Sequence, residues 1–305
     1  MDSPTDTRIA FIGLGVMGLP MALNLHRAGF SVVGHNRSPA RSEAFAAQGG
    51  HTASSVAEAV HHADVVALML PDSPDVEHVL LDEGGVFANA EPGSLVVDFS
   101  TIRPDVARST SAAGAELGFR VLDAPVSGGE QGARDAALSI MVGGDDAAVA
   151  AVMPVLEAVG RTIVHVGPSG AGQTVKAANQ LIVAGTIELV AEAMVFLEAH
   201  GLDVAKAVEV LAGGLAGSAV LDRKAAGMVA RQYKPGFRVA LHHKDLGIAL
   251  SSARDAGVAT PMGALAGQLV GALVAQGRGD LDHSALLAQV EELSGRSAAS
   301  GETRS

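Results

Sequence analysis

Short apolar runs alternate with longer mixed stretches through the first half of the chain. The runs are rich in Val, Ile and Leu and almost continuously apolar, which is typical of strands buried on both faces of a parallel sheet. They cover residues 8–13, 30–35, 64–70, 94–100, 119–125, 137–144 and 162–167. The stretches between them are long enough for helices. This alternation predicts a doubly wound α/β domain, in which the sheet is parallel at least through the fifth strand.

From Gly170 onward the strand pattern stops, and helical stretches follow one another with glycine and proline between them. They cover residues 171–200, 203–212, 219–231, 241–256, 261–277 and 282–293. The first is unusually long, so we expect it to join two domains. The pattern predicts a doubly wound α/β domain, residues 1–167, followed by an all-helical domain, residues 168–295. The polar residues 296–305 are expected to form a flexible tail.

The composition is that of a folded protein with a large core. Of 305 residues, 48% are hydrophobic and 18% are charged, and the net charge is −12. The sequence has no basic run, so nucleic acid is not an expected partner, because phosphate binding needs clustered Lys and Arg. The absence of cysteine removes disulfides and thiolate chemistry.

Neither a secretion signal nor a membrane span is expected. The N-terminus, MDSPTDTR, is polar and acidic, unlike the basic and apolar regions of a signal peptide. Residues 256–277 carry no charge and are long enough to span a bilayer, but Pro261 and Gln268 interrupt them and many of the others are Ala or Gly. A packed helix is the expected structure there, and the chain is predicted to be cytoplasmic.

The first predicted strand runs directly into GLGVMGLPMALNL, in which three glycines are spaced as GxGxxG. Between a strand and a helix, the first glycine permits a tight turn and the second lets a pyrophosphate approach the backbone. The third lets the helix pack on the strand, and the helix N-terminus faces the phosphates. The pattern predicts a Rossmann-type dinucleotide site at Gly13, Leu14, Gly15, Val16, Met17 and Gly18.

The end of the second predicted strand indicates which dinucleotide is bound. An NAD enzyme usually carries an acidic residue there, which accepts hydrogen bonds from the ribose hydroxyls. This chain has Asn36, Arg37 and Ser38 instead, and an arginine suits a phosphate dianion. NADP (as NADPH) is therefore the expected cofactor, with NAD as the alternative.

Further candidate residues lie at the ends of other predicted strands. Ser127, Gly128 and Gly129 follow one strand, where successive glycines can aim backbone N–H groups at an anion. The segments LMLPD, residues 68–72, and DFST, residues 98–101, end two more strands. This is the edge at which open α/β sheets bind ligands.

One lysine heads an otherwise uncharged helical run. Lys176 is followed at i+3 and i+4 by Asn179 and Gln180, so the ammonium and two amides share one helix face. Burying a lysine is costly unless it is paired or its pKa falls, so this face lies at the surface or lines a site that uses the proton. Further along, Lys244 and Asp245 are expected to open a helix.

The sequence contains two pairs of adjacent histidines, a residue type that often binds metal ions. The pairs His61–His62 and His242–His243 lack ligand spacing, and the sequence contains no HExxH or comparable set. We interpret these residues as surface or capping histidines and predict no metal site.

Four motifs in this order resemble those of one family, the β-hydroxyacid dehydrogenases, which are relatives of phosphogluconate dehydrogenase. The motifs are FIGLGVMGLPMALNL, DAPVSGG, GQTVKAANQ and KDLGIAL, and together they span nearly the whole chain. The resemblance implies a Rossmann-type domain, an all-helical second domain and an active site in the cleft between them.

The resemblance also implies roles for single residues. Lys176 corresponds to the catalytic acid/base, and residues 127–129 correspond to the loop that binds the substrate carboxylate. Asn179 and Gln180 correspond to amides that contact the substrate. Cofactor contacts are implied for Leu70, Pro71, Thr101 and Lys244.

A lysine suits the chemistry of this family. Hydride arriving at a carbonyl carbon leaves negative charge on the oxygen, which a protonated amine can stabilise and then neutralise. In the reverse direction, the neutral amine takes the proton of the hydroxyl group. Partial burial near a bound cofactor is expected to lower the pKa of Lys176 toward neutrality.

The second amide of the lysine motif, Gln180, indicates which members of the family the chain resembles most. Related 3-hydroxyisobutyrate dehydrogenases typically have KxxNN, whereas this chain has KAANQ, and LHHKDL further on. Both stretches resemble the tartronate semialdehyde (2-hydroxy-3-oxopropionate) reductases, which form D-glycerate. The expected reaction is the NAD(P)H-dependent reduction of a short semialdehyde carboxylate to the hydroxy acid. The alternatives are a 3-hydroxyisobutyrate or 4-hydroxybutyrate dehydrogenase and a reductase of glyoxylate or succinic semialdehyde.

A non-catalytic NADPH-binding module is an alternative function that is not enzymatic. The intact Lys176 and residues 127–129 count against it.

Several helices of the second half are apolar enough to bury more than one face, which is compatible with packing against a partner subunit. A homodimer or homotetramer is therefore expected.

Overall fold

The computed structural model describes residues 7–296, and the chain divides into two compact units, Met1–Lys176 and Ala177–Ser305. The division falls within one long helix, α9 (Ala171–Ala199), so the N-terminal end of that helix belongs to the first unit. The predicted domain boundary at residue 167 stays a prediction. The predicted tail lies outside the described residues, except for Arg296.

The first unit is built on one sheet, whose strands within residues 7–296 run in the order β3-β2-β1-β4-β5-β6-β8-β7, with β9 beside β8. Strands β1 to β6 pair in parallel, β8 is antiparallel to β6 and β7, and β9 is parallel to β8. The strands are β1 (Arg8–Ile12), β2 (Ser31–His35), β3 (His51–Thr52), β4 (Val65–Leu68), β5 (Leu95–Asp98), β6 (Arg120–Asp123), β7 (Val126–Ser127), β8 (Leu138–Gly143) and β9 (Gly160–Gly167). The strand order reverses between β1 and β4, and such a switch point is where open α/β sheets bind ligands.

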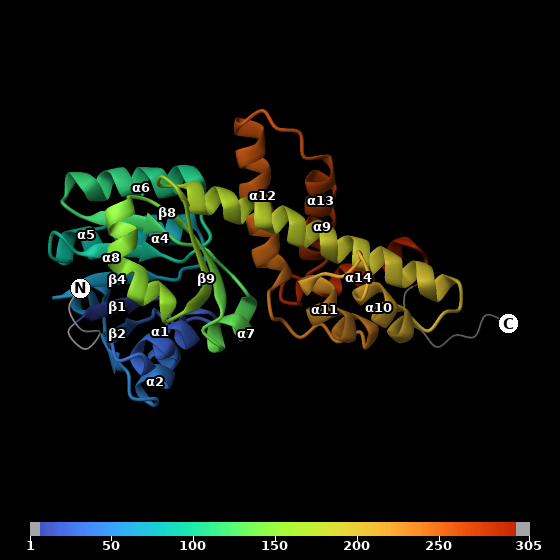
Figure 1. The fold of residues 1–305 in the computed structure, drawn as a ribbon, viewed down its shortest axis with the longest axis horizontal. Coiled ribbons are helices and arrows are strands. Elements are labelled where there is room, and N and C mark those ends of the chain that lie inside the picture. The colour runs from blue at the N-terminus through green and yellow to red at the C-terminus, as the bar shows by residue number, and fades with distance from the viewer. Residues whose placement is uncertain (1–6, 297–305) are drawn as a thin grey trace. The chain divides into compact units, whose positions relative to one another are not determined.

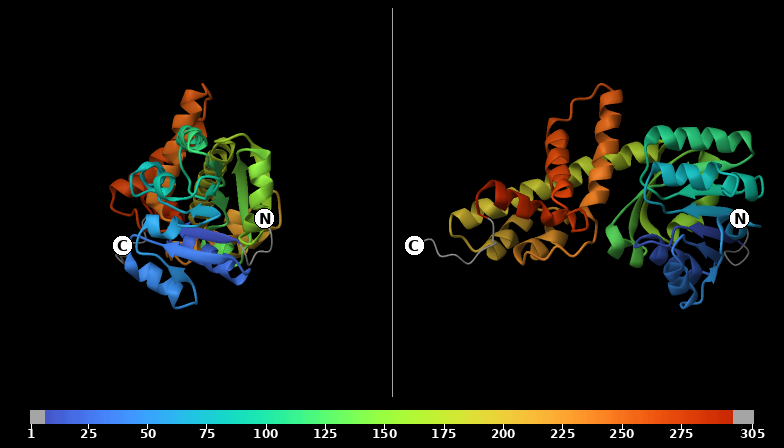
Figure 2. Two further views of the ribbon diagram at one scale, coloured as in Figure 1. Left: turned by 90° about the vertical axis from the view of Figure 1, so that its left-hand side faces the viewer. Right: turned by 180° about the vertical axis from the view of Figure 1, so that it is seen from behind.

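Helices cover both faces of this sheet, as Figures 1 and 2 show. One face carries α1 (Gly18–Arg27), α2 (Pro39–Ala46), α7 (Gly129–Arg134) and α8 (Asp146–Glu157). The other face carries α3 (Val56–Val60), α4 (Ser73–Leu81), α5 (Val86–Asn89) and α6 (Pro104–Glu116). Along β1, Ile9 and Phe11 pack against the first set, and Ala10 and Ile12 pack against the second. Burial on both faces explains why the strand sequences are continuously apolar.

The predicted fold class is confirmed, and each predicted strand overlaps an observed one. Strands β3 and β7 were missed. Each contains only two residues, which is too short to produce a hydrophobic pattern of its own.

The second unit is helical, and its described part holds two apolar clusters along α9. One cluster joins α9 to α12 (Val239–Asp255) and α13 (Pro261–Ala275). The other joins α9 to α10 (Val204–Ala212), α11 (Ala219–Val229) and α14 (Leu286–Leu293). A short 3-10 helix, η2 (His283–Ala285), precedes α14.

The expectation that Lys244 and Asp245 open a helix is wrong, because α12 begins at Val239. The backbone N–H groups of Val239 and Ala240 donate to carbonyl groups of Leu281 and Gly279. No side chain caps this helix. The helix start is therefore satisfied by a distant loop, which leaves no capping signal in the sequence.

Helix α9 is also the one helix among residues 7–296 that is long and apolar enough to cross a membrane. A buried core helix of this length passes the same test, so the helix is only weak support for a membrane span. Its buried positions recur with helical spacing and belong to the two apolar clusters of its own unit, at Ala184, Ile187, Ala191, Met194 and Val195. The uncharged segment at 256–277 forms the shorter α13, as a packed helix.

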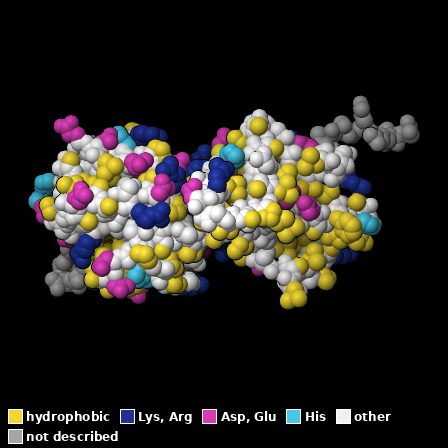
Figure 3. All heavy atoms as spheres, turned by 90° about the horizontal axis from the view of Figure 1, so that it is seen from above, with side chains coloured by type: hydrophobic (Ala, Val, Ile, Leu, Met, Phe, Trp, Pro, Cys, Tyr) yellow, Lys and Arg dark blue, Asp and Glu magenta, His cyan; other side chains and the backbone are white. Residues whose placement is uncertain are grey.

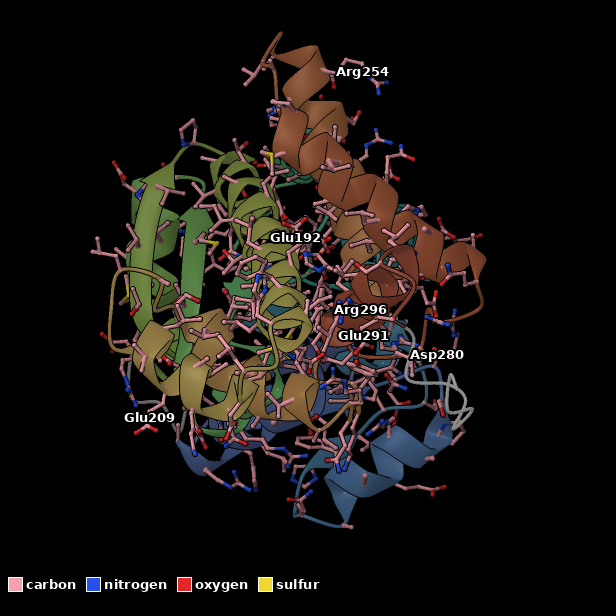
Figure 4. All side chains as sticks on the ribbon, turned by 90° about the vertical axis from the view of Figure 1, so that its right-hand side faces the viewer. Glu192, Glu209, Arg254, Asp280, Glu291 and Arg296 are labelled. Atoms are coloured by element: carbon pink, nitrogen blue, oxygen red, sulfur yellow. The ribbon has the colours of Figure 1, made fainter. Side chains whose placement is uncertain are left out.

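Glu188 is an acidic residue buried in α9. Its side chain is 7% exposed, and its Oε2 has no hydrogen-bond partner. Burial and, secondarily, the charge of Glu192 one turn further along α9 (Figure 4) raise the pKa of Glu188 to about 7. Because this pKa is higher in the folded than in the unfolded chain, deprotonation of Glu188 opposes folding.

The variant Glu188→Gln should therefore match the wild type in stability at pH 4, below the ordinary pKa of a glutamate, and exceed it by about 1–3 kcal/mol at pH 8. Denaturant unfolding at the two pH values measures this difference. The variant Glu209→Gln, which neutralises an exposed glutamate of α10, is the control and should change stability little. A glutamine variant that is less stable than the wild type at pH 8 would contradict the assignment.

Candidate functional site

The glycine turn between β1 and α1 has the geometry that a dinucleotide site requires. Gly13 has φ +101°, where only glycine is relaxed, and its N–H donates to the carbonyl of His35. A Cβ on Gly18 would lie 1.8 Å from the carbonyl oxygen of Gly13, so α1 packs against the turn only with glycine there. A Cβ on Gly15 would meet nothing within 4 Å, which leaves open space above the turn. The residues present therefore fit a pyrophosphate at the N-terminus of α1.

Asn36 shapes this turn from the end of β2. Its Oδ1 accepts a hydrogen bond from the N–H of Leu14 at 2.9 Å, and its Nδ2 donates to the carbonyl of Ser38 at 3.1 Å. The side chain of Leu14 is fully buried in the core. Asn36 therefore holds the main chain of Leu14 in place at the start of the turn.

A hollow of about 300 Å³ opens beside the turn. Gly15 and Val16 line it, together with residues of α1, α2 and α7. Arg41 of α2 is among the lining residues, and Arg37 and Ser38 directly before α2 are exposed. Arg41 was not predicted from the sequence, although an arginine one turn after Arg37 was the available signal.

The ends of β4 and β5 are tied together at the same edge of the sheet. Ser100 Oγ accepts a hydrogen bond from the N–H of Leu70 at 2.8 Å, and the N–H of Ser100 donates to Asp98 Oδ1 at 2.9 Å. Leu70 and Thr101 are half-buried, and Pro71 is exposed. The loops that contain the three expected cofactor contacts are thus held by one serine.

The lysine that heads α9 lies beside the glycine-rich loop after β7. Lys176 is 7% exposed, and its Nζ donates to the carbonyl oxygen of Val126 at 2.7 Å. Val126 precedes Ser127, and the next two residues, Gly128 and Gly129, have φ +144° and +64°. Positive φ at both glycines gives the irregular backbone from which successive N–H groups can bind an anion. The ammonium and this loop therefore lie next to each other within the first unit.

A buried carboxylate sets the start of α9. Asp123 Oδ1 accepts from the N–H of Gly170 at 2.7 Å, and its Oδ2 accepts from the N–H of Gln173 at 2.9 Å. Burial raises the pKa of Asp123, and the hydrogen bonds from backbone N–H groups act in the opposite direction. Asp123 thereby caps the helix from the end of β6, although it lies far from it in sequence.

The amides that follow Lys176 on α9 form a chain of hydrogen bonds in the second unit. Asn179 Nδ2 donates to Gln180 Oε1 at 2.7 Å, and Gln180 Nε2 donates to Asp245 Oδ2 at 2.6 Å. Asp245 also pairs with Lys244, whose Nζ lies 2.8 Å from Asp245 Oδ1. Asp245 is buried and links three of the predicted site residues. From the sequence, Asp245 was predicted only as an acid at a helix start. Its pairing was not predictable there, because it joins α9 to α12.

His242 corrects the interpretation of the histidine pairs. His61, His62 and His243 are exposed, as expected, but His242 is fully buried. Its Nε2 lies 3.4 Å from the carbonyl oxygen of Gln180, and its Nδ1 lies 3.0 Å from Nδ1 of His283. His242 therefore packs behind the amide chain. In residues 7–296, His and acidic side chains form no group of three or more that could hold a metal ion.

The sequence matches two family models that together cover nearly all the described residues. Residues 8–167 match the NAD-binding domain of 6-phosphogluconate dehydrogenase. Residues 170–290 match the NAD-binding domain of NADP-dependent 3-hydroxyisobutyrate dehydrogenase.

Two curated relatives and one solved structure extend this match. The chain is 43% identical to a 2-hydroxy-3-oxopropionate reductase of Escherichia coli K12, over 93% of this chain and 97% of that protein. It is 41% identical to an NAD-dependent L-serine dehydrogenase of Pseudomonas aeruginosa, over 91% of this chain and 95% of that protein. The structure of a Mycobacterium tuberculosis 3-hydroxyisobutyrate dehydrogenase with L-serine has a TM-score of 0.84 and 37% identity, and covers 93% of this chain and 99% of that one.

These matches agree with the turn, the strand order and the helical second unit. They confirm the resemblance, the enzyme class and the NAD(P) cofactor expected from the sequence. The chain is an NAD(P)-dependent oxidoreductase, and it belongs to the 3-hydroxyisobutyrate dehydrogenase-related family of β-hydroxyacid dehydrogenases.

Proposed function

We propose that this enzyme reduces tartronate semialdehyde to D-glycerate with NADPH, and that Lys176 is its general acid/base. The observation that carries the catalytic part is the buried ammonium of Lys176, held by Val126 next to the loop at residues 127–129. A cation beside an anion-binding loop suits a substrate that has a carboxylate and a carbonyl group a short distance apart.

The substrates named for the relatives have one chemical plan. 2-Hydroxy-3-oxopropionate, L-serine and 3-hydroxyisobutyrate are acids with a three-carbon main chain, an oxygen on C3 and one substituent on C2. The substituents are a hydroxyl, an amino and a methyl group. We therefore propose that the redox reaction takes place at C3 and that the substituent on C2 determines which substrate is preferred.

Gln180 supports a hydroxyl group at C2. An amide has two N–H donors and two acceptor positions on its oxygen. Asp245 takes one donor of Gln180, and Asn179 takes one acceptor position. One donor and one acceptor remain on an orientated amide, and a hydroxyl group can use both, whereas a methyl group can use neither.

The proposed reaction divides between the cofactor and the protein. Bound NADPH supplies the hydride that adds to the aldehyde carbon. Residues 127–129 hold the substrate carboxylate, and the ammonium of Lys176 donates a hydrogen bond to the aldehyde oxygen. As the C=O bond becomes a C–O single bond, Lys176 transfers its proton to that oxygen and is left as a neutral amine. In oxidation, the same amine accepts the hydroxyl proton.

The preference for NADPH rests on the end of β2. Arg37 and Ser38 stand where an NAD enzyme usually has an acid, and Arg41 lines the hollow beside the glycine turn. The L-serine dehydrogenase relative is NAD-dependent, so NADH is the alternative cofactor. Leu70, Pro71, Thr101 and Lys244 remain proposed cofactor contacts, together with residues 13–18 and 36–38.

The second unit also offers a surface for self-association. Ile182, Leu189 and Phe196 are exposed apolar residues of α9, spaced seven residues apart on one face. Hydrophobic side chains are widespread on the helical unit in Figure 3. A seven-residue apolar repeat is typical of helix pairing, so we propose a homodimer or homotetramer in the cytoplasm.

A steady-state panel tests the proposed substrate. Tartronate, methylmalonate and succinic semialdehydes and glyoxylate are each reduced with NADPH and separately with NADH. We expect the highest kcat/KM for tartronate semialdehyde with NADPH. A preference for methylmalonate semialdehyde would contradict the role of Gln180 at C2 and favour a 3-hydroxyisobutyrate dehydrogenase. Turnover of any member excludes a non-catalytic NADPH-binding module.

The variant Lys176→Ala tests the acid/base. We expect kcat to fall by about 10²–10⁴-fold, the usual size of a lost acid/base contribution, with NADPH affinity nearly unchanged. Lys206→Ala, which removes an exposed lysine of α10, is the matched control and should keep wild-type kcat. Wild-type kcat in Lys176→Ala would contradict the assignment.

The variant Arg37→Asp tests the cofactor preference. It should raise the dissociation constant of NADPH about 10- to 100-fold, as expected for the loss of a charge-assisted bond to phosphate, and change that of NADH far less. Fluorescence titration of both cofactors measures this, with the exposed Arg120→Asp as the control. Equal weakening of NADPH and NADH would mean that Arg37 does not bind the 2′-phosphate.

A further inference from the structure

Gln173 is a buried amide in the first turn of α9 that none of the roles above uses. Its side chain is among the least exposed polar groups of the described chain, at 1%. A buried amide in an apolar setting is costly unless its donors and acceptors are paired. Where its hydrogen bonds go therefore indicates what this residue holds in place.

The Gln173 side chain bonds to the backbone on both sides of Thr101. Its Oε1 accepts from the N–H of Ile102 at 3.1 Å, and its Nε2 donates to the carbonyl of Ser100 at 2.8 Å. The amide thus pairs with this loop as a neighbouring strand would. Because both flanking peptide groups are fixed, Thr101 between them has a fixed backbone position.

The same loop is joined to the end of β4. Ser100 Oγ accepts from the N–H of Leu70, so the fixed loop in turn holds the backbone of Leu70. Leu70 and Thr101 are proposed cofactor contacts. The side chain of Gln173 therefore holds the loop that contains Thr101 directly, and the backbone of Leu70 through Ser100.

The backbone of Gln173 belongs to the helix that carries the proposed acid/base. Its N–H donates to Asp123 Oδ2, and Lys176 follows one helical turn later, with its Nζ on Val126. A helical turn is a stiff connection, since each residue is held by hydrogen bonds to the next turn. A movement of the loop at Thr101 is thus transmitted to the position of Lys176.

We propose that Gln173 is a positioning residue, which couples the loop at Ser100–Ile102 to the helix of Lys176. It thereby fixes the position of the proton donor relative to the bound cofactor. This inference rests on the proposed function. It assigns no contact with substrate to Gln173. Its effect comes from geometry, because a displacement of about 1 Å at a reacting group can lower a rate about 10²-fold.

The variant Gln173→Met keeps the length of the side chain and removes both hydrogen bonds. We expect kcat for the best semialdehyde to fall about 10- to 100-fold, with KM for the semialdehyde changed less than about threefold. The dissociation constant of NADPH should rise about threefold to tenfold, the equivalent of one lost hydrogen bond. The deuterium isotope effect on kcat with deuterated NADPH should increase, because misaligned hydride transfer limits the rate.

Asn89→Leu is the matched control. Asn89 is also an amide whose Nδ2 donates to two backbone carbonyls, those of Glu83 and Gly85, and its helix, α5, contains none of the proposed site residues. It should lower the melting temperature and leave kcat, the isotope effect and NADPH affinity at wild-type values. If Gln173→Met behaves in the same way as Asn89→Leu, Gln173 is only structural and the proposal is overturned.

Gln173→Glu is a second variant, in which lowering the pH should restore the lost hydrogen-bond donor. Ionised, a glutamate at this position cannot donate to the carbonyl of Ser100, whereas the protonated acid can. Its kcat relative to the wild type should therefore rise as the pH is lowered, and a constant ratio would contradict the proposal.

A wild-type enzyme that reduces no member of the semialdehyde panel would overturn the proposed function alone. The NADPH affinity of Gln173→Met would still decide the role of Gln173.

Discussion

The position at which α9 begins is the constraint on which the rest of the proposed site depends. Asp123 accepts hydrogen bonds from the N–H groups of Gly170 and Gln173, so the helix starts against the end of β6. A Cβ on Gly172 would lie 2.3 Å from the carbonyl oxygen of Met141, so only glycine permits this close approach. With the start fixed, Lys176 falls next to Val126 and the loop that follows it.

Fixing the helix start also explains why a lysine is tolerated in a buried position. Its Nζ donates to a carbonyl oxygen rather than lying unpaired in the core. In the second unit, the next turn of α9 carries Asn179 and Gln180, which Asp245 and Lys244 hold by a continuous set of polar contacts. One helix therefore carries the proposed proton donor and the proposed substrate amides in a fixed order.

Much of this could be predicted from the sequence because the signals are local. The GxGxxG turn, the apolar strands and the spacing of Lys176, Asn179 and Gln180 each lie within one element or one βα unit. Asp245, Asp123 and Gln173 could not be assigned in this way, because their partners lie on other elements. The same reason explains the wrong start of α12, whose first N–H groups bond to the loop at residues 279–281, and the wrong interpretation of His242, which is buried against α9.

If Lys176 is the general acid/base, its protonation state determines the pH dependence of kcat/KM in both directions of the reaction, and this pH dependence is the measurement to make first. A protonated amine is needed for reduction of the semialdehyde and a neutral amine for oxidation of the hydroxy acid. As the pH rises and one group loses its proton, kcat/KM should fall for reduction and rise for oxidation. Both dependences should vanish in Lys176→Ala. A pH dependence that persists in Lys176→Ala would assign the proton to another group and contradict the proposed role of Lys176.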